Sequence, residues 1–348
     1  MSRRALILFA CVSLLWGVPY LFIEIAVEGG ASPLLVGWGR VAIGAAILLP
    51  IAWKLGYLRG LRQHTKALVA FAIVECGLPW WLIPLGQEQV SSSLAAILIA
   101  TLPILTALIA LRIDPEERVG GFRLVGLLLG ITGVILLLGL DVAGRPGELL
   151  GALAILVATA CYAVGVFIVK RNFSDVNPIG AVAVALAIST VMLAPAGIAS
   201  IPGAEISGGA VASIAVLGSF CSALALILFF TLIAEVGPSR ASVITYVNPA
   251  VAVVLGVTLL GESLGTAAVA GLLLIVAGSW ISTGGGMPPG LAAIAARSRR
   301  RRGKGGEKPS AAYSSLRWTP RAATPTPSSP GFGSGSLPSG APKQPRGD

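Results

Sequence analysis

The 348-residue sequence predicts an all-α membrane protein, with ten transmembrane helices arranged as two inverted five-helix repeats. Three observations predict this fold. Hydrophobic residues make up 55% of the chain, whereas charged residues make up only 11%. Apolar stretches of about 20 residues, the length that crosses a bilayer as a helix, recur along residues 5–283. The second half of these residues also repeats the residue spacing of the first half, as duplicated membrane proteins do.

The apolar stretches are predicted to be helices, because backbone polar groups in hydrocarbon must pair within the same segment. The first stretch follows Arg3 and Arg4, as a signal peptide would, but it is too long for one and is interpreted as a retained helix. Ten buried helices in a soluble protein would leave too little polar surface. The predicted spans are residues 5–27, 33–53, 66–86, 92–111, 122–140, 149–169, 178–199, 211–234, 240–260 and 265–283.

The internal duplication is visible in the spacing of Pro, Glu and Gly. In each half, the first glycine follows the glutamate by nine residues and the second glycine follows it by sixteen. Pro33 and Pro50 also recur as Pro178 and Pro195, and the two prolines have the same separation in both halves. The matching residues are Pro103, Glu117, Gly126 and Gly133 in the first half, and Pro249, Glu262, Gly271 and Gly278 in the second. The sequence therefore predicts a first repeat over residues 1–140 and a second over residues 141–283.

The distribution of Lys and Arg predicts the orientation, because these residues favour cytoplasmic loops. With the N-terminus inside, Arg145 is the only basic residue in an outer loop before the tail. Both termini are therefore predicted to be cytoplasmic, in a multi-pass protein of the cell membrane. Five spans per repeat is an odd number, so the second repeat is inverted relative to the first. The inner basic residues are Arg3, Arg4, Lys54, Arg59, Arg62, Lys66, Arg112, Arg118, Arg123, Lys170, Arg171 and Arg240.

Residues 284–348 form a cytoplasmic tail of different composition. The tail holds eleven Lys and Arg and only two acidic residues, and thus most of the net charge of +10. Its Pro, Gly and Ser content predicts disorder. The arginine run has no interleaved aromatic residues, so no nucleic-acid partner is expected, whereas contact with anionic lipid is a candidate role. The candidate lipid contacts are Arg297, Arg299, Arg300, Arg301 and Arg302.

The sequence lacks the motifs of metal, cofactor or ATP chemistry. Its single histidine, His64, lies in a basic loop, and its four cysteines lie in apolar stretches without metal-ligand spacing. No phosphate-binding Gly-x-x-x-x-Gly-Lys-Ser/Thr motif is present. No cofactor, metal or enzymatic reaction is therefore expected. The predicted function is secondary transport of a small molecule by alternating access, and a lipid flippase or scramblase of the same fold is the alternative.

Charged residues inside membrane spans are costly, and they mark candidate functional sites. Glu24 lies near the outer end of the first span, where it can also reach water. Arg40 lies about 10 Å into the second span, at about 1.5 Å per residue. Glu75 lies near the middle of the third span. We predict that Arg40 and Glu75 bind substrate, with Glu75 also a candidate for proton coupling, and an Arg–Glu pair that only joins helices remains the alternative.

Aromatic and proline residues give a second, weaker signal. Trp and Tyr in membrane proteins usually lie at the interfaces, but several here lie inside spans. Pro103 and Pro249 occupy matching places in the two halves and predict helix breaks, which are common at transporter binding sites. The predicted substrate-binding residues are Trp16, Tyr20, Arg40, Glu75, Tyr162, Tyr246 and Asn248.

Several motifs resemble those of EamA domains, which belong to the drug/metabolite transporter superfamily. The resemblance covers residues 5–283 as two tandem domains. Its motifs are Leu14-Leu15-Trp16-Gly17, Ser32-Pro33-Leu34-Leu35 followed by Arg40, Gly86-Gln87-Glu88-Gln89-Val90-Ser91-Ser92 up to Pro103, and Ser239-Arg240-Ala241 through Tyr246-Val247-Asn248-Pro249 to Gly261-Glu262 and Gly271.

The resemblance implies a ten-helix carrier with a central cavity between its halves, typically an exporter of amino acids, other small metabolites or toxic compounds. It also assigns the arginine of the second helix to Arg40, and the loop glutamates to Glu117 and Glu262. These glutamates are expected either to cap the helix that follows or to anchor a turn. The first-half loop, Asp114-Pro115-Glu116-Glu117-Arg118, departs from the usual Gly-Glu.

Overall fold

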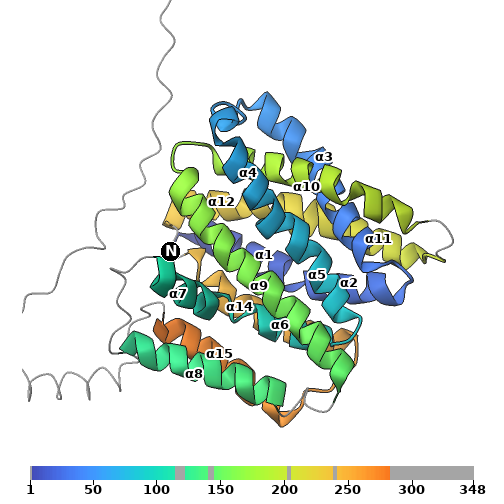
Figure 1. Ribbon diagram of the computed structural model, residues 1–348, viewed down its shortest axis with the longest axis vertical. Helices are drawn as coiled ribbons and strands as arrows, with labels where there is room; N and C mark the ends of the chain where they lie inside the picture. Colours follow the sequence, from blue (N-terminus) through green and yellow to red (C-terminus); the bar gives the residue numbers. More distant parts are fainter. Residues whose placement is uncertain (1, 114–121, 140–144, 202–204, 238–240, 283–348) are drawn as a thin grey trace, which may run out of the picture. The chain divides into compact units, whose positions relative to one another are not determined.

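A computed structural model describes residues 2–113, 122–139, 145–201, 205–237 and 241–282 (Figure 1). Every regular element within these ranges is a helix. In the first half the helices are α1 (Arg3–Gly17), α2 (Pro19–Glu28), α3 (Pro33–Lys54), the 3₁₀-helix η1 (Leu61–His64), α4 (Thr65–Phe71), the π-helix η2 (Ala72–Gly77), α5 (Leu78–Gln87), α6 (Ser92–Ile99), α7 (Leu102–Ile113) and α8 (Phe122–Leu137). In the second half they are α9 (Pro146–Asn172), α10 (Pro178–Ala199), α11 (Gly208–Gly218), the π-helix η4 (Ser219–Leu224), α12 (Ala225–Val236), α14 (Ile244–Leu259) and α15 (Thr266–Ser282).

Seven helical segments of the described chain are long and apolar enough to cross a membrane, and each coincides with a predicted span. Three other predicted spans, at residues 122–140, 240–260 and 265–283, form shorter apolar helices of 10–17 residues. Three features of the prediction lie outside the described residues. They are Glu117, the boundary between the repeats at residue 140, and the tail with its five arginines. The seven long segments are Arg3–Glu28, Pro33–Lys54, Leu61–Gln87, Ser92–Ala110, Pro146–Asn172, Pro178–Ala199 and Gly208–Val236.

The first span consists of two helices that meet at Gly17–Pro19. Pro19 has no N–H to donate to the preceding turn, and α2 begins at this residue, with Val18 between the two helices. Gly17 also allows α14 to approach closely, since a Cβ at Gly17 would lie 2.5 Å from the Val251 side chain. The junction places Trp16 and Tyr20 at the ends of two different helices, next to the middle of the bundle.

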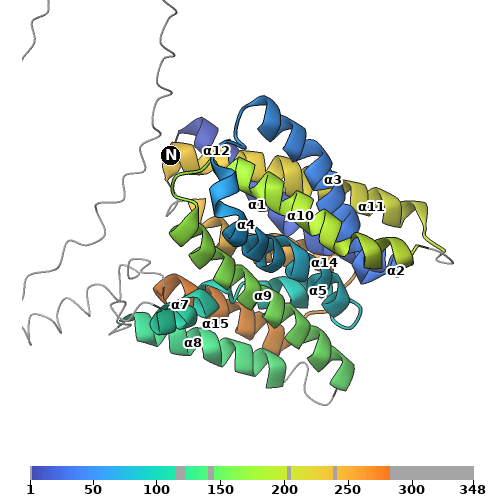
Figure 2. The same ribbon diagram turned by 45° about the horizontal axis from the view of Figure 1, so that its top comes forward.

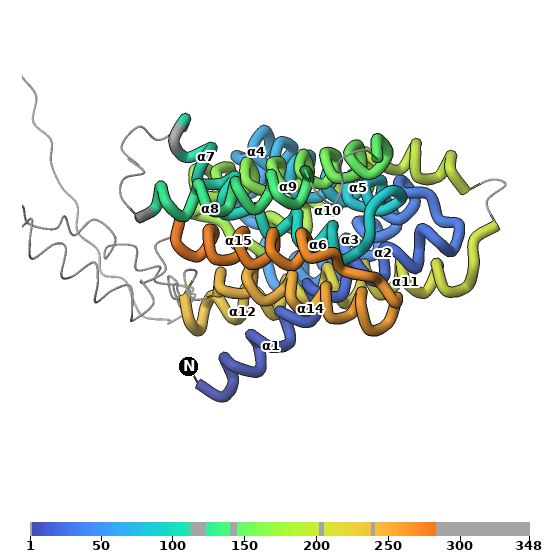
Figure 3. The backbone as a smooth tube through the Cα atoms, turned by 90° about the horizontal axis from the view of Figure 1, so that it is seen from below, coloured from blue at the N-terminus to red at the C-terminus, as the bar shows by residue number. Residues whose placement is uncertain are grey.

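Many helix pairs join the two halves of the chain, and two of them are the most extensive. α3 packs along α10, and α8 packs along α15 (Figures 1 and 2). Buried side chains such as Leu48, Phe71 and Leu186 fill the region where α3, α4 and α10 meet. Seen from a direction turned by 90°, α8, α9 and α15 run along roughly one common direction (Figure 3). Each of these two pairs joins a helix of the first half to the helix with the matching position in the second half.

Glycines allow α8 and α15 to pack backbone against backbone. A Cβ at Gly278 would lie 2.6 Å from the Gly126 carbonyl oxygen and 2.7 Å from the Gly130 Cα. These neighbours are backbone atoms, which cannot move aside as a flexible side chain can. Small residues at such a contact are typical of helix association in membranes.

We therefore expect Gly278→Ala to destabilise the protein by about 1–3 kcal/mol, the usual cost of overpacking a tight contact. Gly208→Ala is the matched control, because nothing lies within 4 Å of a Cβ placed at Gly208. The measurement is thermal unfolding in detergent, monitored by size-exclusion chromatography. Equal melting temperatures for the two variants would show that α8 and α15 do not pack in this way.

Candidate functional site

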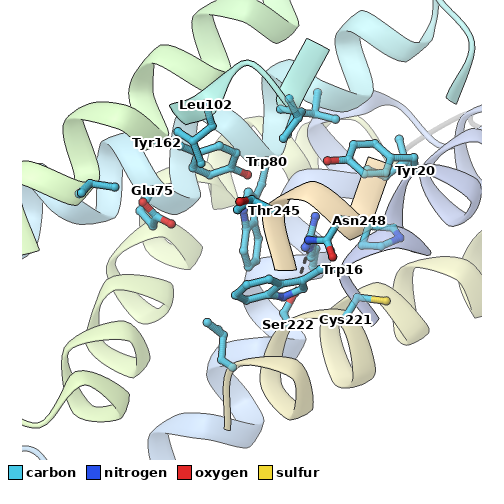
Figure 4. A pocket seen from close by; sticks show the side chains of 17 residues that line it. Trp16, Tyr20, Glu75, Trp80, Leu102, Tyr162, Cys221, Ser222, Thr245 and Asn248 are labelled. Atoms are coloured by element: carbon cyan, nitrogen blue, oxygen red, sulfur yellow. Dashed lines mark hydrogen bonds between the residues drawn. The ribbon is translucent and has the colours of Figure 1, made fainter. Parts of the chain in front are cut away.

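A cavity of about 230 Å³ lies among helices from both halves of the chain (Figure 4). Apolar side chains such as Ile83, Ile99 and Leu102 form much of its wall. Figure 4 shows Glu75 next to Tyr162 on one side of the cavity, with Tyr20 and Cys221 on the opposite side. The polar and aromatic residues that line it are Trp16, Tyr20, Arg40, Glu75, Trp80, Tyr162, Cys221, Ser222, Thr245 and Asn248.

Most of the predicted binding residues line this cavity, although they are far apart in the sequence. They are Trp16, Tyr20, Arg40, Glu75, Tyr162 and Asn248. Tyr246 is not among the lining residues. Its hydroxyl donates to the Ser279 carbonyl at 3.3 Å, and its ring lies 5.5 Å from the Trp280 ring. The structure therefore places Tyr246 at the contact between α14 and α15, because the helix turn directs it away from the face that carries Asn248.

Arg40 is the most constrained charged group of the cavity. It is only 8% exposed, its Nε donates to Ser222 Oγ at 2.9 Å, and its Cζ lies 4.0 Å from the centre of the Trp80 ring. Within the described part of the chain, no carboxylate forms an ion pair with it, and its two terminal nitrogens make no hydrogen bond. The guanidinium is thus held at Nε and on one face, and its outer edge makes no hydrogen bond to a described residue. That edge matches the geometry of a carboxylate.

Ser222 holds this guanidinium in place. Its hydroxyl donates to the Leu217 carbonyl at 2.8 Å and accepts from Arg40, so both of its bonding partners are fixed. A serine within an apolar stretch has no distinctive sequence pattern. Trp80 is one of two consecutive tryptophans, and the sequence does not distinguish it from a residue that only packs against its neighbours. Sequence reasoning therefore missed both partners of Arg40.

We expect Ser222→Ala to weaken the binding of a carboxylate ligand in this cavity by about tenfold, since a hydrogen bond to a charged group contributes about 1.5–3 kcal/mol. Ser219→Ala is the matched control, because Ser219 belongs to the same π-helix but its exposed hydroxyl bonds only the Ala215 carbonyl. The measurement is the ligand concentration at half-saturation of the purified protein. A shift of the same size in both variants would mean that η4 is sensitive to any loss of a hydroxyl.

Glu75 reaches the cavity from the π-helix η2. Among the described residues its carboxylate has neither a hydrogen bond nor an ion-pair partner. Gly165 of α9 leaves room for it, because a Cβ at Gly165 would collide with Glu75 Oε2. Ser189 Oγ of α10 donates to the Ala72 carbonyl at 2.9 Å and so ties η2 to the second half. The predicted alternative, an Arg40–Glu75 pair that joins helices, is not formed in this structure.

The two π-helices lie at comparable places in the two halves. Glu75 is the fourth residue of η2, and Ser222 is the fourth residue of η4. π-Helical turns are rare and often mark functional sites. One π-helix thus presents a carboxylate to the cavity, and the other presents the hydroxyl that holds Arg40.

The two prolines behave differently. α6 ends at Ile99 and α7 begins at Leu102, so the helix is interrupted just before Pro103, and Ile99 and Leu102 both line the cavity. α14 instead continues from Ile244 to Leu259 through Pro249. A proline removes only one helical hydrogen bond, here that of the Thr245 carbonyl, and the remaining bonds keep this helix continuous.

The Asn248 side chain ties α14 to α1. With its amide nitrogen facing these acceptors, it donates to the Ser13 carbonyl at 3.2 Å and to the Ile244 carbonyl at 3.1 Å. Trp16 of α1 packs its ring 4.5 Å from the Phe229 ring. Glu24 of α2 accepts a hydrogen bond of 3.0 Å from Gln87, so this carboxylate has a partner within the protein.

Charged side chains at a cavity within a multi-pass helical membrane protein mark a candidate functional site, as they do in many transporters. Residues 3–139 and 149–284 each match the model of the EamA-like transporter family. The chain therefore belongs to the EamA-like transporter family, and it is a multi-pass membrane protein.

Curated relatives agree with this assignment. An uncharacterized inner membrane transporter of Escherichia coli, YedA, is 30% identical over 72% of this chain and 81% of its own length. An uncharacterized transporter of Bacillus subtilis, YvbV, is 26% identical over 79% of this chain and 90% of its own length. A crystal structure of a protein at 21% identity aligns with a TM-score of 0.57, over 81% of this chain and 97% of the other. That last likeness concerns the fold.

Proposed function

We propose that this protein is a secondary transporter that exports a small, amino acid-like metabolite across the cytoplasmic membrane by alternating access. The main support is the cavity, in which neither Arg40 nor Glu75 has a partner of opposite charge among the described residues. Unpaired charges away from water cost several kcal/mol each, as an order of magnitude. A ligand with a carboxylate and an ammonium group pairs with both charges, and the apolar wall accommodates its side chain.

The size of the cavity supports a small cargo. Its volume of about 230 Å³ is below the range of about 300–1,000 Å³ that is typical of pockets for drug-sized ligands. A phospholipid is larger still, so the observations favour a metabolite over the flippase or scramblase alternative. Export is the direction that the family resemblance suggests.

The proposal includes ten spans in two inverted repeats, over residues 1–140 and 141–283, with both termini cytoplasmic. The matched π-helices and the α3–α10 and α8–α15 pairs support this arrangement. Inverted repeats allow two alternative conformations that are related by pseudo-symmetry, which is the basis of alternating access. The proposed substrate-binding residues are Trp16, Tyr20, Arg40, Glu75, Trp80, Tyr162, Ser222 and Asn248.

Metabolite profiling tests the function. Cells that express the protein are compared with cells that lack it, both inside the cells and in the medium. We expect a small set of dipolar metabolites to accumulate in the medium of the expressing cells only, and the purified protein in vesicles to move the same compounds. Identical profiles on both sides of the membrane, together with lipid movement in the vesicles, would overturn the proposal in favour of a lipid transporter.

A further inference from the structure

The loop between α14 and α15 holds the beginning of α6 through a single carboxylate. Glu262 Oε1 accepts from the Ser92 N–H at 2.8 Å, and Oε2 accepts from the Ser93 N–H at 3.0 Å and from the Ser93 hydroxyl. The first N–H groups of a helix have no partner within the helix, and the helix dipole favours a negative charge there. Glu262 was expected to cap its own following helix or to anchor a turn. Instead, it caps a helix of the other half.

The backbone around Glu262 is built for this contact. The Glu262 N–H donates to the Gly256 carbonyl at 3.1 Å, and Gly261 adopts a positive φ of 68°, which turns the chain at the end of α14. A Cβ at Gly256 would collide with Glu262 Oε2 and with Ser93 Oγ. The glycine therefore lets α14 come close enough for the carboxylate to reach α6.

The contact lies at the first turn of α6, and the last residue of the same helix, Ile99, lines the cavity. α6 packs against α14 and also contacts α9 and α15, which α7, beyond the break, contacts as well. Ile99 lines the cavity seven residues after Ser92, and thus about 10 Å away along the helix. In the orientation predicted by the basic residues, Glu262 lies at the outer face.

We propose that Glu262 is the latch of the outer gate: its carboxylate must leave Ser92 and Ser93 before α6 and α14 can separate and expose the cavity to the outside. This inference rests on the alternating access that we propose for the protein. It depends on neither the identity of the substrate nor its binding residues.

A cysteine at the cavity reports gate opening directly. The four native cysteines are replaced by alanine, and Thr245, which lines the cavity, is changed to cysteine (Thr245→Cys). A membrane-impermeant maleimide is then added from one side of the membrane at a time. We expect Glu262→Ala to increase the rate of labelling from outside at least about tenfold. This is the factor by which the loss of one hydrogen bond to a charged group shifts the equilibrium between the closed and the open gate.

Further variants keep the test decisive. Glu262→Gln retains one acceptor and Ser93→Ala removes only the hydroxyl donor, so both should label faster than the parent chain and slower than Glu262→Ala. Glu148→Gln is the matched control, because the Glu148 carboxylate bonds a neighbour on its own segment, Arg145, at 2.8 Å.

Unchanged labelling in Glu262→Ala and Ser93→Ala overturns the latch, and so does faster labelling from the inner side alone. These rates are read without any transport measurement. The latch and the proposed export function can therefore fail independently of each other.

Discussion

Replacing Arg40 by alanine is expected to abolish export of the dipolar substrate, although the protein still reaches the membrane. The guanidinium is the only cation that lines the described cavity, and a carboxylate bound to its outer edge has no other partner of opposite charge there. Loss of a two-bond, charge-assisted contact costs about 3 kcal/mol or more, which corresponds to at least about a hundredfold in transport efficiency.

Arg40→Lys separates charge from geometry. Lysine keeps the positive charge, but it can neither donate two parallel bonds to a carboxylate nor retain the Nε bond to Ser222. We expect this variant to recover a small part of the activity of the parent chain. Both variants are measured in vesicles at equal protein density, with the substrate found by metabolite profiling. Full activity of Arg40→Lys would show that only the charge matters, and full activity of Arg40→Ala would show that transport does not depend on Arg40.

The sequence was sufficient to predict an all-helical membrane protein and to single out several residues that line the cavity, because both depend on the cost of polar groups in hydrocarbon. Arg40 and Glu75 stand out in apolar spans for this reason, and both face the cavity in the structure. Tyr246 carries the same signal as Tyr162, an aromatic residue within a span, yet it packs between α14 and α15. The face on which a side chain lies depends on the rotation of its helix, which hydropathy alone does not determine.

The residues that the sequence could not identify act through neighbours from distant parts of the chain. Ser222 is important because η4 brings it 2.9 Å from Arg40, and Gly165 because it leaves room for Glu75. Neither contact has a local signature, since serine and glycine are common in membrane helices. The π-helices also have no simple sequence pattern. For Glu262, the repeat identified the residue, but only the three-dimensional contact shows that its partner is α6.

Glu75→Gln is expected to reduce transport of the dipolar substrate at least about tenfold, because one charge-assisted hydrogen bond to a cation contributes about 1.5–3 kcal/mol. Glutamine has nearly the same shape and fits the space that Gly165 leaves, so the change removes the charge and leaves the packing intact. The loss should therefore appear as a higher substrate concentration at half-maximal transport. Glu28→Gln is the matched control, since Glu28 is exposed and does not line the cavity.

An analogue that lacks the ammonium group distinguishes the two roles predicted for Glu75. If Glu75 binds the ammonium group, the parent chain should transport this analogue poorly. Glu75→Gln should then transport the analogue as well as the parent chain does, or better. If Glu75 instead carries the coupling proton, Glu75→Gln should bind the full substrate with unchanged affinity, and its transport should no longer respond to a pH gradient. The geometry favours the first outcome, because Arg40 and Glu75 line one cavity without pairing with each other. Arg40 is therefore available to the carboxylate of a dipolar molecule, and Glu75 to its ammonium group.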